Sequence, residues 1–371
     1  MQKMYDFVVV GGGLFGITFA RYAADAGKSC IVLERRDRIG GNVITDEIEG
    51  IHVHTHGPHI FRTNSSEIWK LANRFAEFNS FVNRPKARIG DEIYSFPINL
   101  MTMYQLFGVK TPEEAKEVIA KDIVPAPFGH PRNAEEQLLS TVGKTLYEKF
   151  FYGYTTKQWG RSPRSLDATI VSRLPVRFTF DDNYFNAKFQ GIPIGGYTKW
   201  MENMAEGVNV QLKTDFNADI EYWRSQGKTV VFSGGVDELF RFEEFGPLEY
   251  RGLRFEHEIM DIPDFQGNAV INYPSIDVPW TRITEHKHFD IGSYGNVNKT
   301  VVTKEYPATW SPGETAYYPI SDDANHIKYA KYKERAESEL RLVLGGRLGE
   351  YRYYDMDQVI ASAMSKVKKL I

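Results

Sequence analysis

A glycine-rich turn near the start of the chain constrains its fold more than any other feature. The turn spans Gly11 to Gly16 with the spacing G-x-G-x-x-G, and it stands between an apolar run at 7–10 and an apolar stretch with helical periodicity. A second apolar run, 29–33, ends on Glu34. The order strand, turn, helix, strand, followed by an acidic residue, predicts the first unit of a Rossmann-like, dinucleotide-binding domain. The alternative is an ordinary glycine-rich turn, which would not need the acidic residue.

Each glycine of the turn has a physical role in this prediction. Gly11 permits the tight turn, Gly13 lets a diphosphate approach the backbone, and Gly16 allows close packing of the helix on the strand. The helix N-terminus offers free N–H groups and partial positive charge to phosphates. Glu34 can accept hydrogen bonds from both ribose hydroxyls of an adenosine.

The pattern R-x-G-G, from Arg38 to Gly41, follows closely after Glu34. Paired glycines let a second backbone segment approach the cofactor. The pattern at this place is typical of FAD proteins rather than NAD enzymes, and the alternative is an ordinary surface turn. We therefore expect FAD as the dinucleotide.

Composition excludes several classes of protein. The 371 residues are 42% hydrophobic and 25% charged with a formal net charge of −3, which is not the basic balance of a nucleic-acid-binding protein. No apolar run approaches the roughly 18 residues of a membrane span, and the run before Gly11 is too short for a signal peptide. The single cysteine, Cys30, cannot form a disulfide within the chain, which fits a reducing compartment. We expect a cytoplasmic protein of two or three domains with no nucleic-acid partner.

Four of the nine histidines lie close together in the sequence, at His52, His54, His56 and His59. The first three alternate, so on a strand they would share one face, as metal ligands can. Neither a cysteine nor a close carboxylate completes a fourth ligand, and a half-buried strand gives the same alternation. We therefore predict no metal. We single out His59 because the Gly-Pro pair before it forces a sharp turn that brings the backbone close to a neighbouring group.

Changes of periodicity divide the rest of the chain. The region 98–152 lacks strand signals and starts one helix at the capping box from Thr111 to Glu114. From Arg177 the period changes to two, which indicates a largely antiparallel sheet. The predicted strands of that sheet are 178–180, 248–258, 269–273 and 300–306, and the runs 208–212 and 229–232 are predicted to return to the first sheet. We predict an α/β protein: a Rossmann-like FAD-binding domain with an inserted helical domain and an antiparallel β-sheet domain.

The predicted domains are discontinuous in sequence. They are an FAD-binding domain of residues 1–85, 192–240 and 325–371, a helical lid domain of 86–165, and an antiparallel sheet substrate domain of 166–191 and 241–324. Further helices are predicted at 64–81 and 166–174. The segment 150–160 is dense in aromatic residues, so it is either a packing segment or a platform on which a base stacks. Gly153 and Gly160 would interrupt a core helix, which favours the platform.

Several of these stretches together resemble the bacterial UDP-galactopyranose mutases over essentially the full chain. Besides the turn, they include YTTKQWGR (154–161), PVRFTF (175–180), QGNAVINY (266–273) and YYDM (353–356). The resemblance implies interconversion of UDP-galactopyranose and UDP-galactofuranose through a covalent sugar adduct at N5 of reduced FAD, for galactofuranose-containing cell-surface glycans. No side chain in the sequence is an obvious activated nucleophile, which agrees with catalysis by the cofactor. The resemblance also implies an external reductant such as NAD(P)H or a reductase, and a homodimer.

The same resemblance implies a set of site residues. For FAD these are Gly11, Gly13, Phe15, Gly16, Glu34, Arg35, Gly41, His59, Ile60, Arg347, Tyr354, Asp355, Met356, Asp357, Gln358 and Val359. For the UDP-sugar they are Asn83, Phe150, Phe151, Tyr154, Thr155, Trp159, Arg173, Tyr184, Asn272, Arg282, Tyr318, Tyr353 and Asp355, with Tyr317 as an alternative to its neighbour Tyr318. Catalytic roles are implied for His59, Arg173 and Arg282, the two arginines as a clamp on the diphosphate.

Other functions remain open from the sequence. An FAD oxidoreductase of the amine-oxidase kind shares the glycine turn, Glu34 and R-x-G-G, but an apolar amine would not need the paired arginines at 173 and 282. A non-catalytic protein that binds flavin or a nucleotide sugar would have lost a contact residue. A mutase acting on a related nucleotide sugar, such as a dTDP-6-deoxyhexose, differs only in local contacts.

Overall fold

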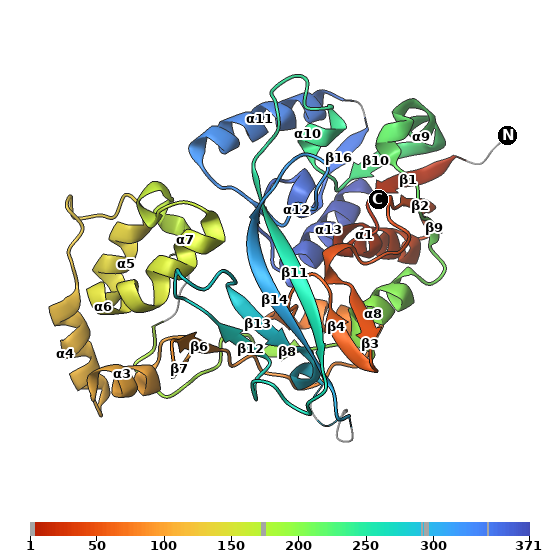
Figure 1. Ribbon diagram of the computed structural model, residues 1–371. Helices are drawn as coiled ribbons and strands as arrows, with labels where there is room; N and C mark the ends of the chain where they lie inside the picture. The colour runs from red at the N-terminus through yellow and green to blue at the C-terminus, as the bar shows by residue number, and fades with distance from the viewer. Residues whose placement is uncertain (1–3, 172–175, 291, 293–296, 340) are drawn as a thin grey trace.

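The N-terminal unit has the order that the sequence predicts. In the computed structural model, which describes residues 4–171, 176–290, 292, 297–339 and 341–371 (Figure 1), β1 (Tyr5–Val10) leads through the glycine turn into α1 (Leu14–Asp25) and then β2 (Cys30–Leu33). After α1 ends, Gly27 adopts a φ of +75°. Glycine takes this left-handed conformation without the strain that a side chain would add, so it stops the helix.

Five parallel strands form the first sheet, in the order β16-β10-β1-β2-β9. β9 (Asn209–Gln211) and β10 (Gly227–Phe232) are the runs predicted to return to this sheet, and β16 (Leu342–Leu344) is an edge strand that we did not predict. Val10 pairs with both Leu33 and Phe232, so β1, β2 and β10 end together beside the glycine turn. Segments from both ends of the chain therefore assemble one dinucleotide-binding sheet.

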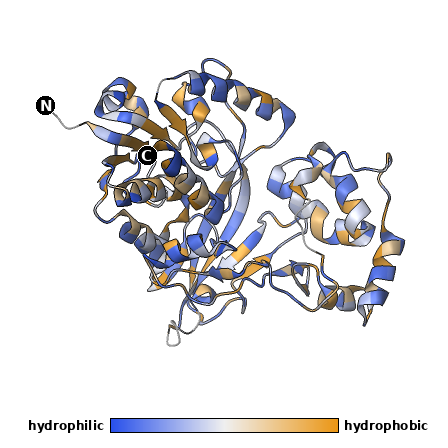
Figure 2. Cartoon of the chain, turned by 180° about the vertical axis from the view of Figure 1, so that it is seen from behind, coloured by the Kyte–Doolittle hydropathy of each residue, from blue (hydrophilic) through white to orange (hydrophobic). Residues whose placement is uncertain are grey.

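Apolar side chains cover both faces of this sheet. Phe7 and Val9 of β1 pack with α1, α8 (Gly196–Ala205) and α13 (Met356–Leu370), whereas Val8 packs on the opposite face with Trp223 of α9 (Ile220–Gln226). Figure 2 shows the apolar colouring concentrated in these strands. Because both faces are buried, β1 has a continuous apolar sequence instead of an alternating one.

The second sheet has seven strands in the order β15-β11-β14-β13-β12-β6-β7 and is antiparallel except between β12 and β6. Its long central pair, β11 (Tyr250–Met260) and β14 (Thr300–Thr309), runs between the first sheet and the helical region (Figure 1). The remaining strands are β6 (Lys86–Ile89), β7 (Glu92–Ser95), β12 (Val270–Asn272), β13 (Arg282–Glu285) and β15 (Tyr318–Pro319). The predicted antiparallel sheet is confirmed.

Four segments differ from the sequence predictions. Residues 86–95 were assigned to the helical lid but form the hairpin β6–β7, whose alternation is carried by too few apolar residues to be recognised. The predicted strand 178–180 is not a strand, and of the predicted helix 166–174 the described residues form only the 3₁₀ turn Ala168–Ile170. The helix predicted at 64–81 ends at Asn73, because the Asn79 backbone N–H donates to Ile192 O (2.9 Å) and draws the chain out of the helix.

The helical region has a core of its own, which includes Tyr94, Leu138 and Phe150, and it lies to one side of the long strands (Figure 1). The predicted capping box is present: Thr111 Oγ1 accepts from the Glu114 N–H, and the Glu114 carboxylate accepts from the Thr111 N–H. The region comprises α3 (Leu100–Phe107), α4 (Pro112–Asp122), α5 (Ala134–Val142), α6 (Lys144–Leu146), a π-helical turn (Tyr147–Tyr152) and α7 (Gly153–Trp159).

Shorter elements complete the fold. They are β3 (Thr45–Ile48), β4 (Ile51–His54), β5 (Phe61–Thr63), α2 (Ser66–Asn73), β8 (Phe189–Gly191), α10 (Val236–Leu239), α11 (Asp323–Ser338) and α12 (Gly346–Gly349). Within the described ranges, no helix combines the length and the apolar character needed to cross a membrane.

Candidate functional site

In the glycine turn, close backbone contacts exclude a side chain at Gly16 but not at Gly13. A Cβ on Gly16 would lie 1.9 Å from the carbonyl oxygen of Gly11, and Gly11 itself has a φ of +100°. A Cβ on Gly13 would meet nothing nearer than Gly41 Cα, at 3.8 Å. The protein therefore leaves space over Gly13, and backbone N–H groups at the start of α1 border that space.

Glu34 is buried and bound to the turn. Its carboxylate accepts hydrogen bonds from the backbone N–H of Gly12 (2.7 Å) and of Arg36 (2.8 Å). A carboxylate has about four acceptor positions, so these two bonds fix its orientation and leave capacity for ribose hydroxyls.

Two further glycine pairs approach the same turn. Gly40 donates its N–H to Gly12 O (2.9 Å), and a Cβ on Gly41 would lie 3.0 Å from Gly13 Cα. On the other side, a Cβ on Gly345 would lie 2.0 Å from Cζ of Phe15. The R-x-G-G segment thus meets the turn as predicted, whereas the contact between 345–346 and Phe15 was not predicted.

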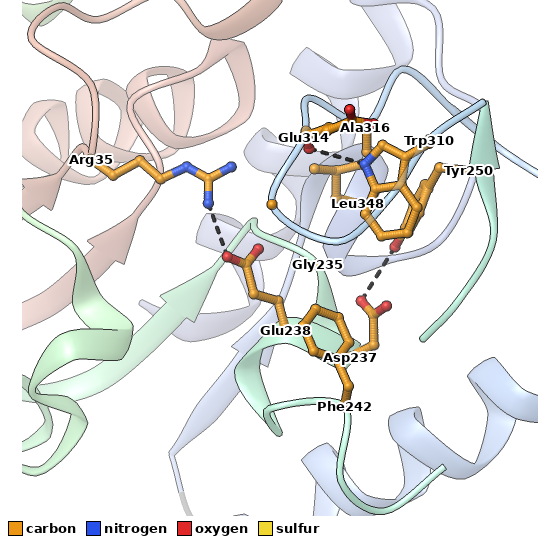
Figure 3. A pocket seen from close by; sticks show the side chains of 11 residues that line it. Arg35, Gly235, Asp237, Glu238, Phe242, Tyr250, Trp310, Glu314, Ala316 and Leu348 are labelled. Carbon is orange, nitrogen blue, oxygen red and sulfur yellow. Dashed lines mark hydrogen bonds and ion pairs between the residues drawn. The ribbon is translucent and has the colours of Figure 1, made fainter. Parts of the chain in front are cut away.

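Arg35 lines a small pocket between α10 and the segment 310–316 (Figure 3). Its Nη1 pairs with Oε1 of Glu238 at 2.9 Å, and the rings of Tyr250 and Trp310 pack edge to face on the far side. Burial raises the pKa of Asp237, whose carboxylate accepts from the Leu248 N–H (2.8 Å). This pocket adjoins the end of β2 that carries Glu34.

The C-terminal residues implied for FAD lie at the N-terminus of α13. The guanidinium of Arg347 donates to the carbonyl oxygens of Tyr317 (3.1 Å) and Tyr354 (2.7 Å). Gln358 Oε1 accepts from the Asp355 N–H (2.9 Å), and Asp355 pairs with Arg62 (2.8 Å), a residue we did not predict. The other three implied residues, Met356, Asp357 and Val359, belong to the first turn of this helix.

His59 and Ile60 lie in the loop between β4 and β5. Nδ1 of His59 is 2.8 Å from Gly57 O, which can only accept, so this nitrogen carries the proton and Nε2 keeps a lone pair. Burial lowers the pKa of His59 to about 4, with Arg347 and Arg282 contributing. At neutral pH the ring is therefore uncharged and offers one acceptor.

Three other histidines form a hydrogen-bonded chain behind this loop. His54 Nδ1 accepts from the His59 N–H (3.1 Å), and His286 Nδ1 accepts from the His54 N–H (3.2 Å). His286 Nε2 then bonds Thr303 Oγ1 (2.6 Å), which also contacts His257 Nδ1 (2.7 Å). The donors and acceptors named here are thus paired with other protein groups, and their hydrogen bonds hold the backbone that carries His59.

Arg282 lies on β13, the middle strand of the second sheet. It stands on β13 opposite Glu305 of β14, with Nε 3.2 Å from Glu305 Oε1, and Nη2 donates to the hydroxyl of Tyr154 on α7 (3.2 Å). Burial alone would lower the pKa of Arg282, but Glu305 and the surrounding tyrosine hydroxyls outweigh it and raise the pKa. The guanidinium is therefore a fixed, desolvated positive charge.

Tyrosines from several segments surround this charge. Tyr184 and Tyr318 lie close enough to Arg282 to affect its pKa, and the ring of Tyr318 stacks on Tyr353 with centroids 5.8 Å apart. Tyr317 points elsewhere, because its hydroxyl bonds His56 Nδ1 at 2.7 Å. Of the two neighbours it is therefore Tyr318 that the structure brings to Arg282.

The remaining implied substrate residues are divided between β12, α7 and its neighbours, and the core of the helical region. Asn272 is the cross-strand neighbour of Arg282, and Asn83 has a buried Oδ1 with no hydrogen-bond partner in the described part of the chain. Thr155 and Trp159 belong to α7, like Tyr154. The side chains of Phe150 and Phe151 are buried in the helical core, and Trp159 packs against the same core while partly buried. Arg173 lies outside the described residues.

A parallel sheet with a glycine cradle at its carboxyl edge, covered by an acid and a second glycine pair, defines a flavin-type dinucleotide-binding protein. A sequence profile described as UDP-galactopyranose mutase matches residues 149–353, and one described as an NAD(P)-binding Rossmann-like domain matches 9–75. The chain belongs to the UDP-galactopyranose mutase family.

Individual relatives agree with this assignment. The chain is 41% identical over 371 residues to a probable UDP-galactopyranose mutase of Klebsiella pneumoniae, with 99% of this chain and 94% of the relative covered. It is 38% identical over 369 residues to a dTDP-fucopyranose mutase of Escherichia coli, with 97% of each covered. In fold it is similar to a crystal structure of reduced UDP-galactopyranose mutase, with a TM-score of 0.76 at 14% identity over 99% of this chain and 95% of that one.

Proposed function

We propose that this chain interconverts UDP-galactopyranose and UDP-galactofuranose, with reduced FAD as the working cofactor. The observation that carries the proposal is the buried Arg282 guanidinium, which faces tyrosine hydroxyls beside His59 and Arg347. A planar, always-charged fork suits a diphosphate, and hydroxyl groups suit a sugar. An apolar amine, the substrate of the alternative oxidase class, would find no use for this charge.

The residues near the turn fit FAD. The space over Gly13, the close approach of Gly41, and the remaining acceptor capacity of Glu34 suit a diphosphate and a ribose, and His59 and Arg347 would border the flavin. When bound, reduced flavin supplies an electron-rich nitrogen for the anomeric carbon. An external reductant such as NAD(P)H or a reductase would provide its electrons.

The chain's own residues bind and orient the reactants. Arg282 would stabilise the negative charge that grows on the diphosphate as it leaves, and Glu305 keeps the guanidinium in place. His59 offers a neutral acceptor through Nε2. Cys30 is unsuited to act as a nucleophile, because burial in β2 raises the pKa of its thiol to about 12.

Turnover under controlled redox conditions tests the proposal. Dithionite-reduced holoenzyme should convert UDP-galactofuranose to UDP-galactopyranose without stoichiometric loss of reductant, as followed by chromatography. The same protein kept oxidised should be inactive. Conversion by the fully oxidised protein, or none by the reduced protein, would contradict the proposal.

One relative favours a second substrate. The similarity to the E. coli dTDP-fucopyranose mutase extends over nearly the whole chain, at 38% identity. The two nucleotide sugars differ by a methyl group on the base, by the 2′-hydroxyl of the nucleoside and by the 6-hydroxyl of the hexose, and local contacts to these groups decide the preference. Parallel assays with dTDP-fucopyranose and UDP-galactopyranose, compared by kcat/KM, would identify the preferred substrate.

A further inference from the structure

α7 is attached to the loop that follows β12 at two points one helical turn apart. A Cβ on Gly153 would lie 2.3 Å from Pro274 O, so helix backbone touches loop backbone there. Lys157 is four residues further on and therefore shares the same face of the helix. Both contacts are made with the segment 273–281.

The side chain of Lys157 ends inside that loop. Its Nζ donates to three backbone carbonyl oxygens, those of Tyr273 (2.6 Å), Val278 (2.8 Å) and Trp280 (2.9 Å). An ammonium group has three donors, so all of them are used. Burial lowers the pKa of Lys157 to about 8.

The loop leads directly into the strand that carries Arg282. The Tyr273 N–H donates to Thr281 O at 2.9 Å, which closes the loop at its base, and Arg282 is the next residue. On the helix side, Tyr154 is one residue from Gly153, and its hydroxyl accepts from Nη2 of Arg282 (3.2 Å). Lys157 thus joins α7, which bears Tyr154, Thr155 and Trp159, to the loop that ends immediately before Arg282.

We propose that Lys157 is a positioning residue that sets the separation between the nucleoside-binding face of α7 and the phosphate-binding guanidinium of Arg282. This role rests on the proposed function, because it assigns the two ends of one UDP group to these two elements. The three carbonyl bonds act on the loop and not on the ligand. Removing them should cost affinity only for a ligand that spans both ends.

The test compares UDP with its parts. Affinities of the oxidised holoenzyme for UDP, uridine and pyrophosphate are measured for wild type, Lys157→Met and Lys157→Arg. The matched control is Lys149→Met, which removes an ammonium of the same region that pairs with Glu92 at the surface (2.7 Å). We expect Lys157→Met to weaken UDP at least tenfold, to change uridine and pyrophosphate less than twofold, and to speed hydrogen exchange of 273–281. Lys149→Met should match wild type.

The measured affinities distinguish a positioning role of Lys157 from a merely structural one. Equal UDP affinity of wild type and Lys157→Met with full FAD content would overturn the positioning role alone. Equal weakening of all three ligands would indicate a merely structural role and also overturn it. Should Lys157→Met fail to fold, Lys157→Arg decides, because a planar fork cannot reproduce three convergent bonds and should weaken UDP at least threefold. A wild-type protein that binds no UDP would end both this role and the proposed function.

Discussion

At the scale of single residues, Arg282 owes its position to a partner that lies far from it in sequence. Glu305 is its cross-strand neighbour, is almost fully buried, and places its carboxylate against the guanidinium. Removing either charge would leave the other buried and unpaired, which is strongly destabilising. A test of Arg282 must therefore keep the positive charge.

The variant Arg282→Lys keeps the charge and loses the fork. The guanidinium spreads its donors over the three nitrogens of a planar fork, whereas the three donors of an ammonium diverge from one atom and do not match the positions of Glu305, Tyr154 and a phosphate. Each charge-assisted hydrogen bond contributes about 1.5–3 kcal/mol. We expect the affinity for UDP to fall by roughly one to two orders of magnitude with FAD still bound, as measured by calorimetry on the holoenzyme. Arg254→Lys, which alters an exposed ion pair with Glu256 on β11, is the control and should bind UDP normally. Normal UDP affinity in Arg282→Lys would remove Arg282 from the phosphate site.

The buried histidines make stability depend on pH. Burial lowers the pKa of His286 to about 3, against an ordinary value of 6.5. Between these values the unfolded chain binds one more proton than the folded chain, so the stability contributed by a neutral His286 is complete above pH 6.5 and falls as the pH drops below it.

The variant His286→Gln tests this linkage. Glutamine retains an acceptor and a donor for the His54 N–H and Thr303, but it does not titrate. Urea unfolding from pH 7.5 to 5.5 should show a free energy of unfolding that falls on acidification in wild type. In the variant this fall should be smaller by about 1.4 kcal/mol per pH unit below pH 6.5. His130→Gln, on the exposed surface of the helical region, is the control, and an unchanged slope in His286→Gln would contradict the prediction.

At the scale of elements, the glycines of the turn meet two different requirements: one is set by the packing of the protein itself and the other by a ligand. Gly16 is needed by the protein, because its Cβ would overlap the backbone of Gly11. Gly13 is not, since a Cβ there has ordinary contacts and the residue's φ is −78°. Its glycine identity is explained by a ligand.

Two alanine variants distinguish these requirements. Gly16→Ala should destabilise the ligand-free protein by about 1–3 kcal/mol, the usual effect of overpacking, and lose FAD. Gly13→Ala should leave the unfolding free energy of the ligand-free protein unchanged and yet lose FAD. Urea titrations and the flavin absorbance of purified protein measure both effects. Normal FAD content in Gly13→Ala would argue against a diphosphate over the turn.

At the scale of the whole molecule, two separate cores meet at the site. One core joins α1, α8 and α13 to the first sheet, and the other holds α3 to α7 together. Arg282 stands on β13, where its neighbour Ile283 packs in a third cluster, and Lys157 ties α7 to the loop before this strand. Because the two cores are separate clusters of buried side chains, their stabilities are expected to differ.

Hydrogen exchange checks this expectation. Without ligand, amides of α4 and α5 should exchange faster than those of β1 and α1. UDP should protect α7 and 273–281, because a ligand that binds only the native arrangement at 100 times its dissociation constant adds about 2.7 kcal/mol. Uniform exchange across both cores, unaltered by UDP, would contradict the prediction.

The amino-acid sequence alone determined the local structure that depends on neighbouring residues. The glycine turn with its strands and helix, the capping box at Thr111, and the terminal helix follow from periodicity and backbone sterics, which act over a few residues. The same local signals misassigned 86–95 and extended α2 beyond Asn73, because the hairpin and the segment around Asn79 pair with distant partners.

Only the tertiary structure decided which side chains share the site. It paired Arg282 with Glu305, placed Tyr318 near Arg282 and the Tyr317 hydroxyl on His56, buried Phe150 and Phe151 in the helical core, and inserted Lys157 into a loop more than a hundred residues away. Such contacts come from strand register and from the packing of segments far apart in the chain. Neither leaves a periodic trace in sequence, since register depends on what lies opposite a residue and not on what precedes it.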